Sequence, residues 1–162
     1  MRGLMTIALV LLAWLTACAQ GRWTVSHREA DELKGEKAQD VYIYDVDGVG
    51  SLVVWDWNSP NFRLISERGI FRKMVSGGST YVPVTVGFYD ENGKLEKGFT
   101  INLLEELNHS GRFIATAERY LFGRKDIKKT LARLKSGKGY VRMVAMLYNQ
   151  PDFDLRVTPY QK

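Results

Sequence analysis

Two alternating segments joined by an Asn-Gly turn constrain the fold of this chain more than any other feature. Within residues 81–89 an apolar side chain occupies every second position: Val82, Val84, Val86 and Phe88. This period of two is typical of a β-strand that buries one face. Residues 90–94 contain the Asn-Gly signal of a hairpin turn, and residues 95–103 return as the partner strand. Because Pro83 has no N–H to donate, we expect it at an unpaired edge or at a bulge.

Most of the remaining chain has the same β character. β-branched and aromatic residues concentrate in short segments bounded by glycine or proline, which predicts further strands. These strands are residues 41–46, 51–57, 62–65, 69–75, 112–120, 140–148 and 153–158. Residues 104–107 are expected to form one helical turn. Residues 140–148 are apolar on both faces except at Arg142, which is typical of a central strand covered on each side.

One segment has the pattern of an amphipathic helix. In residues 126–136 the apolar side chains Ile127, Leu131 and Leu134 follow the spacing i, i+4, i+7, which places them on one stripe. Asp126 can cap the start of this helix, and Gly137 can end it. Many strands, one helix and no internal repeat predict a mainly β protein, an antiparallel β-sandwich with the helix in one crossover. An α+β roll is the alternative.

The first residues carry the signals of an exported and anchored protein. Arg2 precedes an apolar run, residues 4–15, which has the length of a secretory h-region and is too short to span a bilayer. The run leads into Leu-Thr-Ala-Cys at residues 15–18, which resembles the lipobox of bacterial lipoproteins. The resemblance covers these residues alone, and Cys18 is the only cysteine of the chain. It implies cleavage before Cys18, a diacylglyceryl thioether on its sulfur and, usually, a third acyl chain such as palmitate on the freed amine.

The same resemblance implies an address. Two or three acyl chains anchor a protein stably where one chain would not. Ala19-Gln20-Gly21 follow the cysteine, so the Asp that retains many Gram-negative lipoproteins in the inner membrane is missing, and so is an acidic cluster for export to the cell surface. We therefore expect the periplasmic face of an outer membrane.

We divide the chain into three parts. Residues 1–17 are the signal peptide, residues 18–40 a lipid-anchored tether, and residues 41–162 a single β-rich domain. The tether is expected because residues 26–40 are polar and charged, with few side chains to bury. If residues 23–25 form a first strand instead, the tether is much shorter, and we favour placing Trp23 in the domain.

Charge and cysteine content exclude several kinds of site. The 23 Lys and Arg against 18 Asp and Glu give a net charge of +5, which falls by one when Arg2 is removed with the signal peptide. A nucleic-acid partner is not expected, because its binder would need a dense basic stripe. With Cys18 acylated, no thiol remains for a disulfide, a redox centre or a thiolate metal site. We expect no cofactor and no metal.

The sequence Ile-Tyr-Asp-Val-Asp-Gly-Val, residues 43–49, contains two carboxylates after an apolar strand. It resembles the first motif of haloacid-dehalogenase-type phosphatases, in which one Asp is the nucleophile and the other the general acid. The chain departs from that family directly afterwards, because Gly50 and a second β-run follow in place of a helix. Asp45 and Asp47 also resemble the beginning of a calcium-binding EF-hand loop, but the twelfth position of that loop carries no Glu. We interpret Asp45 and Asp47 as parts of a hairpin turn.

Two sets of side chains remain as candidate binding residues. Basic residues of the helix form one set: Lys125, Lys128, Lys129, Arg133 and Lys135, with Arg124 and Lys138 at its borders. They are expected to be a solvated helix face, and on an anchored protein they are also able to approach anionic lipid headgroups. Trp55 and Trp57 form the second set, with Tyr42 and Tyr44 in the neighbouring strand; such aromatics serve as core or as a platform for sugar or peptide.

No catalytic constellation is visible in the sequence. His27 and His109 are the only histidines, and they lie far apart, so we expect both to be solvated. Asp152 and Asp154 are expected to pair with Arg156 on the surface of the last strand. The sequence therefore predicts a lipid-anchored binding or scaffold module of the cell envelope, not an enzyme, whose partner is an envelope protein or a glycan. A small envelope hydrolase, with a site assembled only in space, is the alternative.

Overall fold

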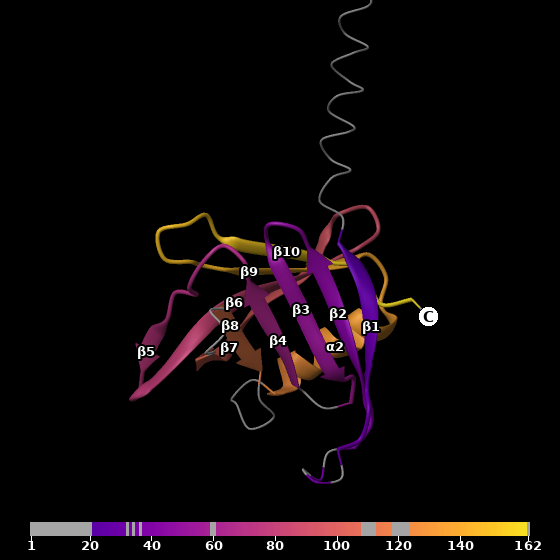
Figure 1. Ribbon diagram of the computed structural model, residues 1–162. Coiled ribbons are helices and arrows are strands. Elements are labelled where there is room, and N and C mark those ends of the chain that lie inside the picture. Colours follow the sequence, from indigo (N-terminus) through magenta and orange to yellow (C-terminus); the bar gives the residue numbers. More distant parts are fainter. Residues whose placement is uncertain are drawn as a thin grey trace, which may run out of the picture.

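A computed structural model describes residues 21–31, 33, 35, 37–58, 61–107, 113–117 and 124–161. Within these residues the chain forms strands and one helix, α2 (Figure 1). Their bounds are β1 Arg22–Arg28, β2 Gln39–Val46, β3 Gly50–Asp56, β4 Asn61–Ser66, β5 Met74–Ser76, β6 Ser79–Tyr89, β7 Leu95–Leu107, β8 Phe113–Ala117, α2 Arg124–Ser136, β9 Tyr140–Ala145 and β10 Phe153–Val157.

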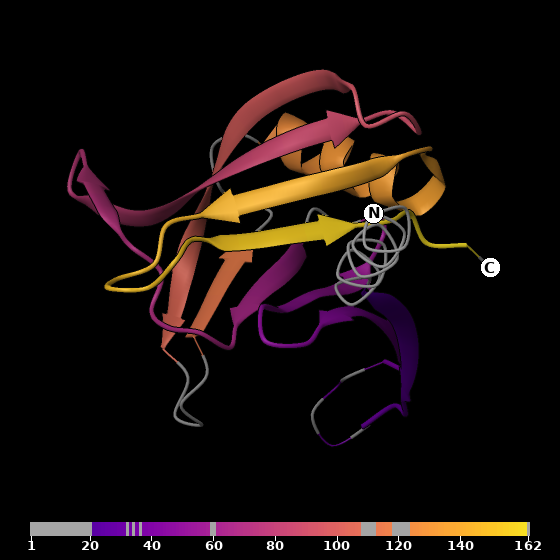
Figure 2. The same cartoon turned by 90° about the horizontal axis from the view of Figure 1, so that it is seen from above.

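The described strands form one antiparallel sheet in the order β1-β2-β3-β4-β8-β7-β6-β9-β10, with β5 attached to β6. Figures 1 and 2 show this sheet folded over, so that β1 to β4 cross β6, β9 and β10 at a steep angle. The helix α2 lies in the connection from β8 to β9. The predicted mainly β, antiparallel fold with a helix in a crossover is therefore confirmed, and its two layers are halves of one continuous sheet.

Strand β7 carries the chain from one half of the sheet to the other. Its first part, as far as Leu103, pairs with β6, whereas Leu104–Leu107 pair with β8. The helical turn expected at residues 104–107 is therefore wrong. The apolar and acidic residues there are compatible with either state, and the sheet contact decides between them because β8 supplies the hydrogen-bond partners.

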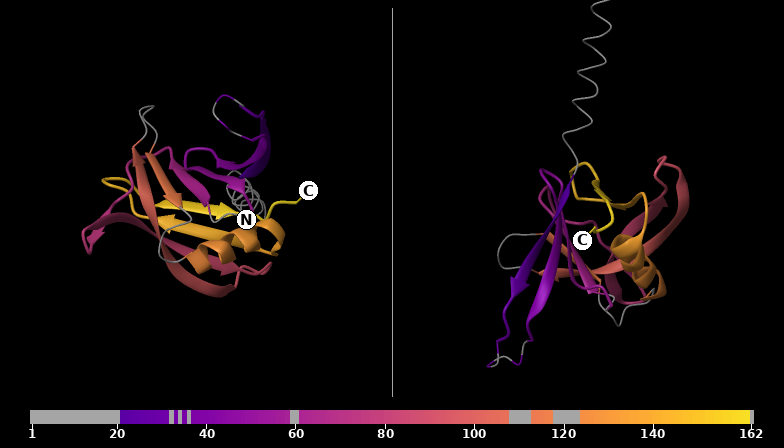
Figure 3. Two further views of the ribbon diagram at one scale, coloured as in Figure 1. Left: turned by 90° about the horizontal axis from the view of Figure 1, so that it is seen from below. Right: turned by 90° about the vertical axis from the view of Figure 1, so that its right-hand side faces the viewer.

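The core lies between the two halves of the sheet and is one continuous cluster. The alternation predicted for residues 81–89 is confirmed, because Val82, Val84 and Val86 are fully buried in β6. The apolar stripe of α2 joins the same core: Ile127, Leu131 and Leu134 are at most 1% exposed. Figure 3 shows α2 packed against this folded sheet.

Pro83 lies where the sequence placed it, at an unpaired edge. On one side it faces Asn102 of β7. On the other side β5 ends its pairing at Tyr81 and β9 begins at Thr85. Pro83 therefore lies between the ends of two neighbouring strands, where no backbone N–H is needed for pairing.

The segment 140–148 forms a shorter and more one-sided strand than predicted. β9 ends at Ala145, and it buries Val141, Met143 and Ala145 while Arg142 stays half-buried. Arg142 donates to both carboxylate oxygens of Asp154, from Nε at 2.8 Å and from Nη2 at 2.6 Å. This bidentate contact, helped by Tyr89, raises the pKa of Arg142 above its ordinary value. Asp154 therefore pairs with Arg142, and not with Arg156 as predicted.

Two further strand predictions need new bounds. In residues 69–75, only the last positions belong to β5, while Phe71 makes an isolated bridge with Leu147. In residues 112–120, β8 covers Phe113–Ala117, and the other positions lie outside the described residues. The segments begin or end where a partner strand begins or ends, which local sequence does not encode.

Strand β1 corrects the expected tether. All seven of its residues, Arg22–Arg28, pair with β2, from Arg22 opposite Asp45 to Arg28 opposite Gln39. Residues 22–28 are polar on their outward positions, which is why the sequence resembled a tether, yet a β-strand at a sheet edge needs few apolar residues. The favoured placement of Trp23 in the domain agrees with this pairing. In the described residues, no helix has the length and apolar character needed to cross a membrane.

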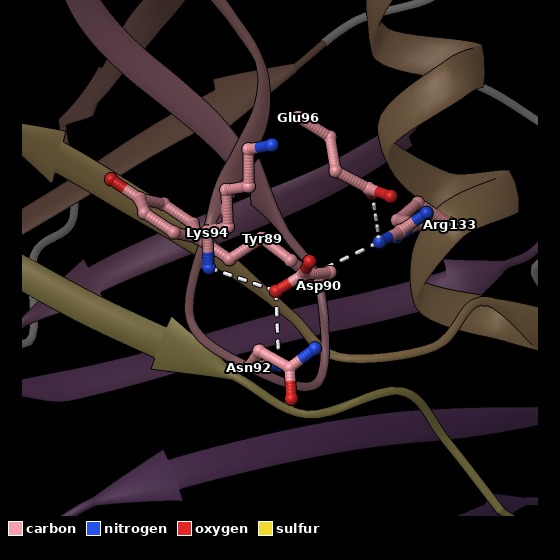
Figure 4. Close-up of polar contacts among 6 residues, drawn as sticks. All are labelled: Tyr89, Asp90, Asn92, Lys94, Glu96 and Arg133. Atoms are coloured by element: carbon pink, nitrogen blue, oxygen red, sulfur yellow. Dashed lines mark hydrogen bonds and ion pairs between the residues drawn. The ribbon is translucent and has the colours of Figure 1, made fainter.

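The hairpin between β6 and β7 is held by hydrogen bonds within its turn and by a side chain of α2 (Figure 4). One carboxylate oxygen of Asp90 accepts the backbone N–H groups of Asn92 and Lys94 at 2.9 and 2.8 Å. From α2, the Arg133 guanidinium donates to the Tyr89 carbonyl at 3.1 Å and to Glu96 at 2.5 Å. The helix therefore holds the end of this hairpin through Arg133.

Candidate functional site: an aromatic cleft

Five aromatic side chains from four separate segments gather at one end of the folded sheet. They are Trp23 from β1, Tyr42 and Tyr44 from β2, Trp57 from the residues after β3, and Tyr160 from the residues after β10. Neighbouring ring centroids lie 5.0 Å apart for Tyr42 and Tyr160 and 5.7 Å apart for Trp23 and Trp57. These are the separations of tilted and edge-to-face aromatic pairs.

The strand register explains the positions of three of these five residues. Trp23 and Tyr44 are directly opposed in the β1–β2 ladder, so both rings lie on the same face of the sheet. Tyr42 is two residues from Tyr44 and shares that face. Tyr44 is buried, whereas Tyr42 is half-buried at the edge of the cluster.

A β-bulge separates the two tryptophans that the sequence grouped together. The register of β3 against β4 shifts between Val54 and Asp56, and such a shift changes the direction of the side chains that follow. Trp57 consequently packs against the aromatic cluster. Trp55 lies under the guanidinium of Arg63, 4.5 Å from the ring centroid.

The C-terminal segment closes the cluster from the other side. The indole Nε1 of Trp23 donates to the Thr158 carbonyl at 2.7 Å, and the Tyr160 N–H donates to the Leu134 carbonyl at 2.7 Å. Thr158 and Tyr160 thus connect β1 with the last turn of α2. The aromatic ring of Tyr160 is held where it meets Tyr42, Trp57 and Trp23.

A cleft of about 540 Å³ opens beside these rings, and we call it the aromatic cleft. Its lining residues are Asp40, Tyr42, Trp55, Asp56, Trp57, Asn58, Lys135 and Tyr160. The aromatic members are half-buried and the polar members are exposed. Aromatic and polar side chains thus contribute equally to the lining, and the volume lies within the range of about 300 to 1,000 Å³ that is typical of small-molecule sites.

Two carboxylates of the cleft are oriented by neighbours. Oδ1 of Asp56 accepts the backbone N–H of Asn58 at 2.8 Å. Oδ1 of Asp40 lies 2.8 Å from Nδ1 of His27, its opposite residue in the β1–β2 ladder. This contact was not expected from sequence, since residues 27 and 40 were assigned to a tether. His27 is still well solvated, with 65% of its side chain exposed.

The basic residues of α2 divide into two kinds. Arg133 is committed to Tyr89 and Glu96, and Lys129 pairs with Asp126 at 3.2 Å. Lys125 and Lys128 are exposed on the outer side of the helix. The structure thus leaves Lys125 and Lys128 on the surface, and it places Lys135 in the aromatic cleft.

Asp45 and Asp47 lie at the connection from β2 to β3, and both are exposed. Glu67 accepts the N–H of Gly48 at 3.1 Å, and the guanidinium of Arg68 donates to the Gly48 carbonyl. This arrangement is a hairpin turn clamped by its neighbour strand. Among the described residues, no group of three or more His, Cys, Asp or Glu side chains is placed to hold a metal ion.

Several cleft residues were missed by the sequence analysis. Trp23 and Tyr160 lie near opposite ends of the chain, and no local pattern relates them. Asp40 and Lys135 were assigned to a tether and to a helix surface. Cys18 and His109 lie outside the described residues.

A comparison with family models, with curated proteins and with solved structures finds no match to this chain.

Proposed function

We propose that this chain is a lipid-anchored binding protein of the bacterial cell envelope and that its binding site is the aromatic cleft. The observation that carries the proposal is the composition of the cleft, where Tyr42, Trp57 and Tyr160 form an apolar wall beside Asp40, Asp56 and Lys135. Such walls bind ligands that have both an apolar and a polar face. The segments that carry the wall are already held together by hydrogen bonds, so their side chains lose little conformational freedom on binding.

The resemblance of residues 15–18 to a lipobox supports the anchored part of the proposal. A cleft on an anchored domain acts on ligands that are themselves confined to the envelope, because the lipid restricts the domain to a thin layer above the membrane. In this setting a modest affinity is sufficient, since the effective concentration of a neighbouring ligand is high.

A small envelope hydrolase is the second candidate, and the His27–Asp40 contact favours it. A carboxylate on Nδ1 orients an imidazole so that Nε2 is available as a general base. The pair borders the cleft through Asp40. If this activity exists, His27→Ala removes turnover while ligand binding to the aromatic wall remains.

Site-directed photocrosslinking in living cells tests the proposed function. A photoreactive residue at Asn58, on the rim of the cleft, is expected to give an adduct with an envelope component. The same residue at Lys94, in the exposed turn between β6 and β7, is the matched control and is expected to give none. The Asn58 adduct should disappear when Trp57→Ala is added. Equal adducts from both positions, or none from Asn58, overturn the cleft as the binding site.

The anchor is tested separately at Cys18. Cys18→Ala should abolish metabolic labelling with radioactive palmitate and move the protein out of the membrane fraction, because the thiol is the acyl acceptor. Cys18→Ser is the conservative variant and should behave in the same way, since a hydroxyl does not replace the thiolate. Labelling that survives both substitutions contradicts the lipoprotein assignment.

A further inference from the structure

We propose that the ligand of the aromatic cleft is an uncharged saccharide, whose pyranose face lies on the wall formed by Tyr42, Trp57 and Tyr160. The inference rests on the proposed binding function and adds the chemical class of the ligand. It follows from three properties of the cleft: the ring arrangement, the polar groups beside the rings and the local charge.

The ring arrangement favours a flat ligand with an apolar face. Trp57 and Tyr160 are inclined by 31° at 6.0 Å between centroids, and both line the cleft. Tyr42 stands against both, 5.2 Å from Trp57 and 5.0 Å from Tyr160. A pyranose ring presents C–H groups on one face and hydroxyl groups around its edge, which matches an aromatic surface bordered by polar side chains.

The polar groups of the cleft match sugar hydroxyls. Each hydroxyl both donates and accepts a hydrogen bond. The carboxylates of Asp40 and Asp56 accept, Lys135 donates, and the amide of Asn58 does both. All four side chains are exposed at the cleft, next to half-buried rings. Hydrogen bonds to charged groups are the stronger ones, so these residues are able to fix the orientation of a stacked sugar.

A quaternary ammonium fits the cleft less well, and a peptide is the competing ligand class. A quaternary ammonium needs ring faces around an empty box, whereas Trp23, Tyr42, Trp57 and Tyr160 pack against one another. An extended peptide adds to an unpaired strand edge. β2 and β3 pair with each other only as far as Tyr42 and Val54, so a peptide is the competing outcome that the crosslink at Asn58 distinguishes.

The local charge selects against acidic sugars. Asp40 and Asp56 contribute two negative charges and Lys135 one positive charge. A uronic acid would meet a net negative lining, which weakens its binding. A neutral sugar avoids this repulsion.

The experiment uses the full chain, purified in a polyoxyethylene detergent, which carries neither a sugar nor an ammonium headgroup. The probes are cellobiose and N,N′-diacetylchitobiose as neutral disaccharides, digalacturonate as an acidic one, and tetramethylammonium as a cation. Intrinsic tryptophan fluorescence and saturation-transfer NMR report binding. The neutral disaccharides should saturate the fluorescence change, and digalacturonate should bind at least about tenfold more weakly.

Variants locate the binding. Trp57→Ala should weaken the neutral sugar about tenfold or more, and Asp56→Asn about tenfold, the effect of losing one charged hydrogen bond. Tyr148→Ala and Asp47→Asn are the matched controls; both residues are exposed and neither lines the cleft, so affinity should not change. Because Asp56 is exposed, its substitution keeps the test valid if Trp57→Ala fails to fold.

The outcomes separate this inference from the proposed function. Binding of tetramethylammonium without the neutral sugars, or equal binding of digalacturonate, overturns the saccharide assignment. So does a neutral sugar that binds Asp56→Asn and Trp57→Ala as tightly as it binds the wild type. A crosslink from Asn58 to a protein, in the absence of sugar binding, retains the binding function and rejects its saccharide ligand. The absence of any crosslink from Asn58 in the otherwise wild-type protein rejects the function itself.

Discussion

The indole N–H of Trp23 donates a hydrogen bond to the carbonyl oxygen of Thr158 at 2.7 Å, across 135 residues of sequence. This contact joins β1, at one end of the sheet, to the residues that follow β10 at the other end. It brings Tyr160 onto Trp23, with centroids 5.8 Å apart. One wall of the aromatic cleft therefore depends on a bond between the two ends of the described chain.

Trp23→Phe tests that bond. Phenylalanine keeps an aromatic ring in the cluster and removes the donor, so the free energy of unfolding should fall by about 1 kcal/mol. Differential scanning calorimetry measures the change. Tyr160 should also become more exposed to solvent, which fluorescence quenching reports. Trp55→Phe is the control, because the ring of Trp55 packs against the Arg63 guanidinium. An equal effect of both substitutions contradicts a special role for the Trp23 donor.

Gly50 and Gly48 form a matched pair for backbone strain. Both have positive φ, +136° and +69°. A Cβ at Gly50 would overlap the carbonyl oxygen of Ile65, whereas a Cβ at Gly48 meets nothing within 4 Å. Gly48→Ala should therefore lower the free energy of unfolding by about 1 to 2 kcal/mol, which is the cost of placing a Cβ in the left-handed backbone region. Gly50→Ala should cost clearly more in urea denaturation, because β3 must move away from β4.

The helix is tested by truncating its buried stripe and reversing its surface charge. Leu131 is 1% exposed, so Leu131→Ala should cost about 2 to 5 kcal/mol. The double variant Lys128→Glu with Lys129→Glu should change the melting temperature little. Lys128 is exposed and the Lys129–Asp126 pair is solvated, and exposed pairs contribute about 0 to 1 kcal/mol. A melting temperature that falls more with the charge reversal than with Leu131→Ala would show that the lysine face of α2, and not the leucine face, is buried.

Arg133 should differ from the other basic residues of α2. Its guanidinium donates to Tyr89 and Glu96 and lies 5.7 Å from the centroid of Phe88. Arg133→Ala should increase amide hydrogen exchange in the β6–β7 turn, because the hairpin end loses its contact with the helix (Figure 4). Lys125→Ala is the control, and exchange there should stay unchanged. Protection of Asn92 and Lys94 that persists in Arg133→Ala contradicts this role.

The pair Asp45 and Asp47 should carry no phosphatase chemistry. Both lie in an exposed, clamped hairpin turn, so Asp45→Asn with Asp47→Asn should preserve the fold. Hydrolysis of p-nitrophenyl phosphate with magnesium is the measurement. Activity of the purified wild type that disappears in the double variant would reverse our interpretation of this turn.

Local pattern was sufficient for the parts of the fold that depend on neighbouring residues. The β6–β7 hairpin follows from alternation and an Asn-Gly turn, and α2 follows from three apolar residues with a helical period. Where pairing partners decide, prediction failed: residues 104–107 became strand because β8 lies beside them. Residues 22–28 became β1 because β2 lies beside them.

The aromatic cleft divides in the same way between sequence and tertiary structure. The sequence determined that Tyr42, Tyr44, Trp55 and Trp57 lie in one hairpin, because adjacent strands with a short connection must pair. It did not determine which of them line a cleft, since the bulge between Val54 and Asp56 sets the direction of Trp57. Nor did it bring in Trp23, Tyr160 and Lys135, which meet only after the sheet folds over. Contacts between distant segments arise from packing of the whole core, and no local period records them.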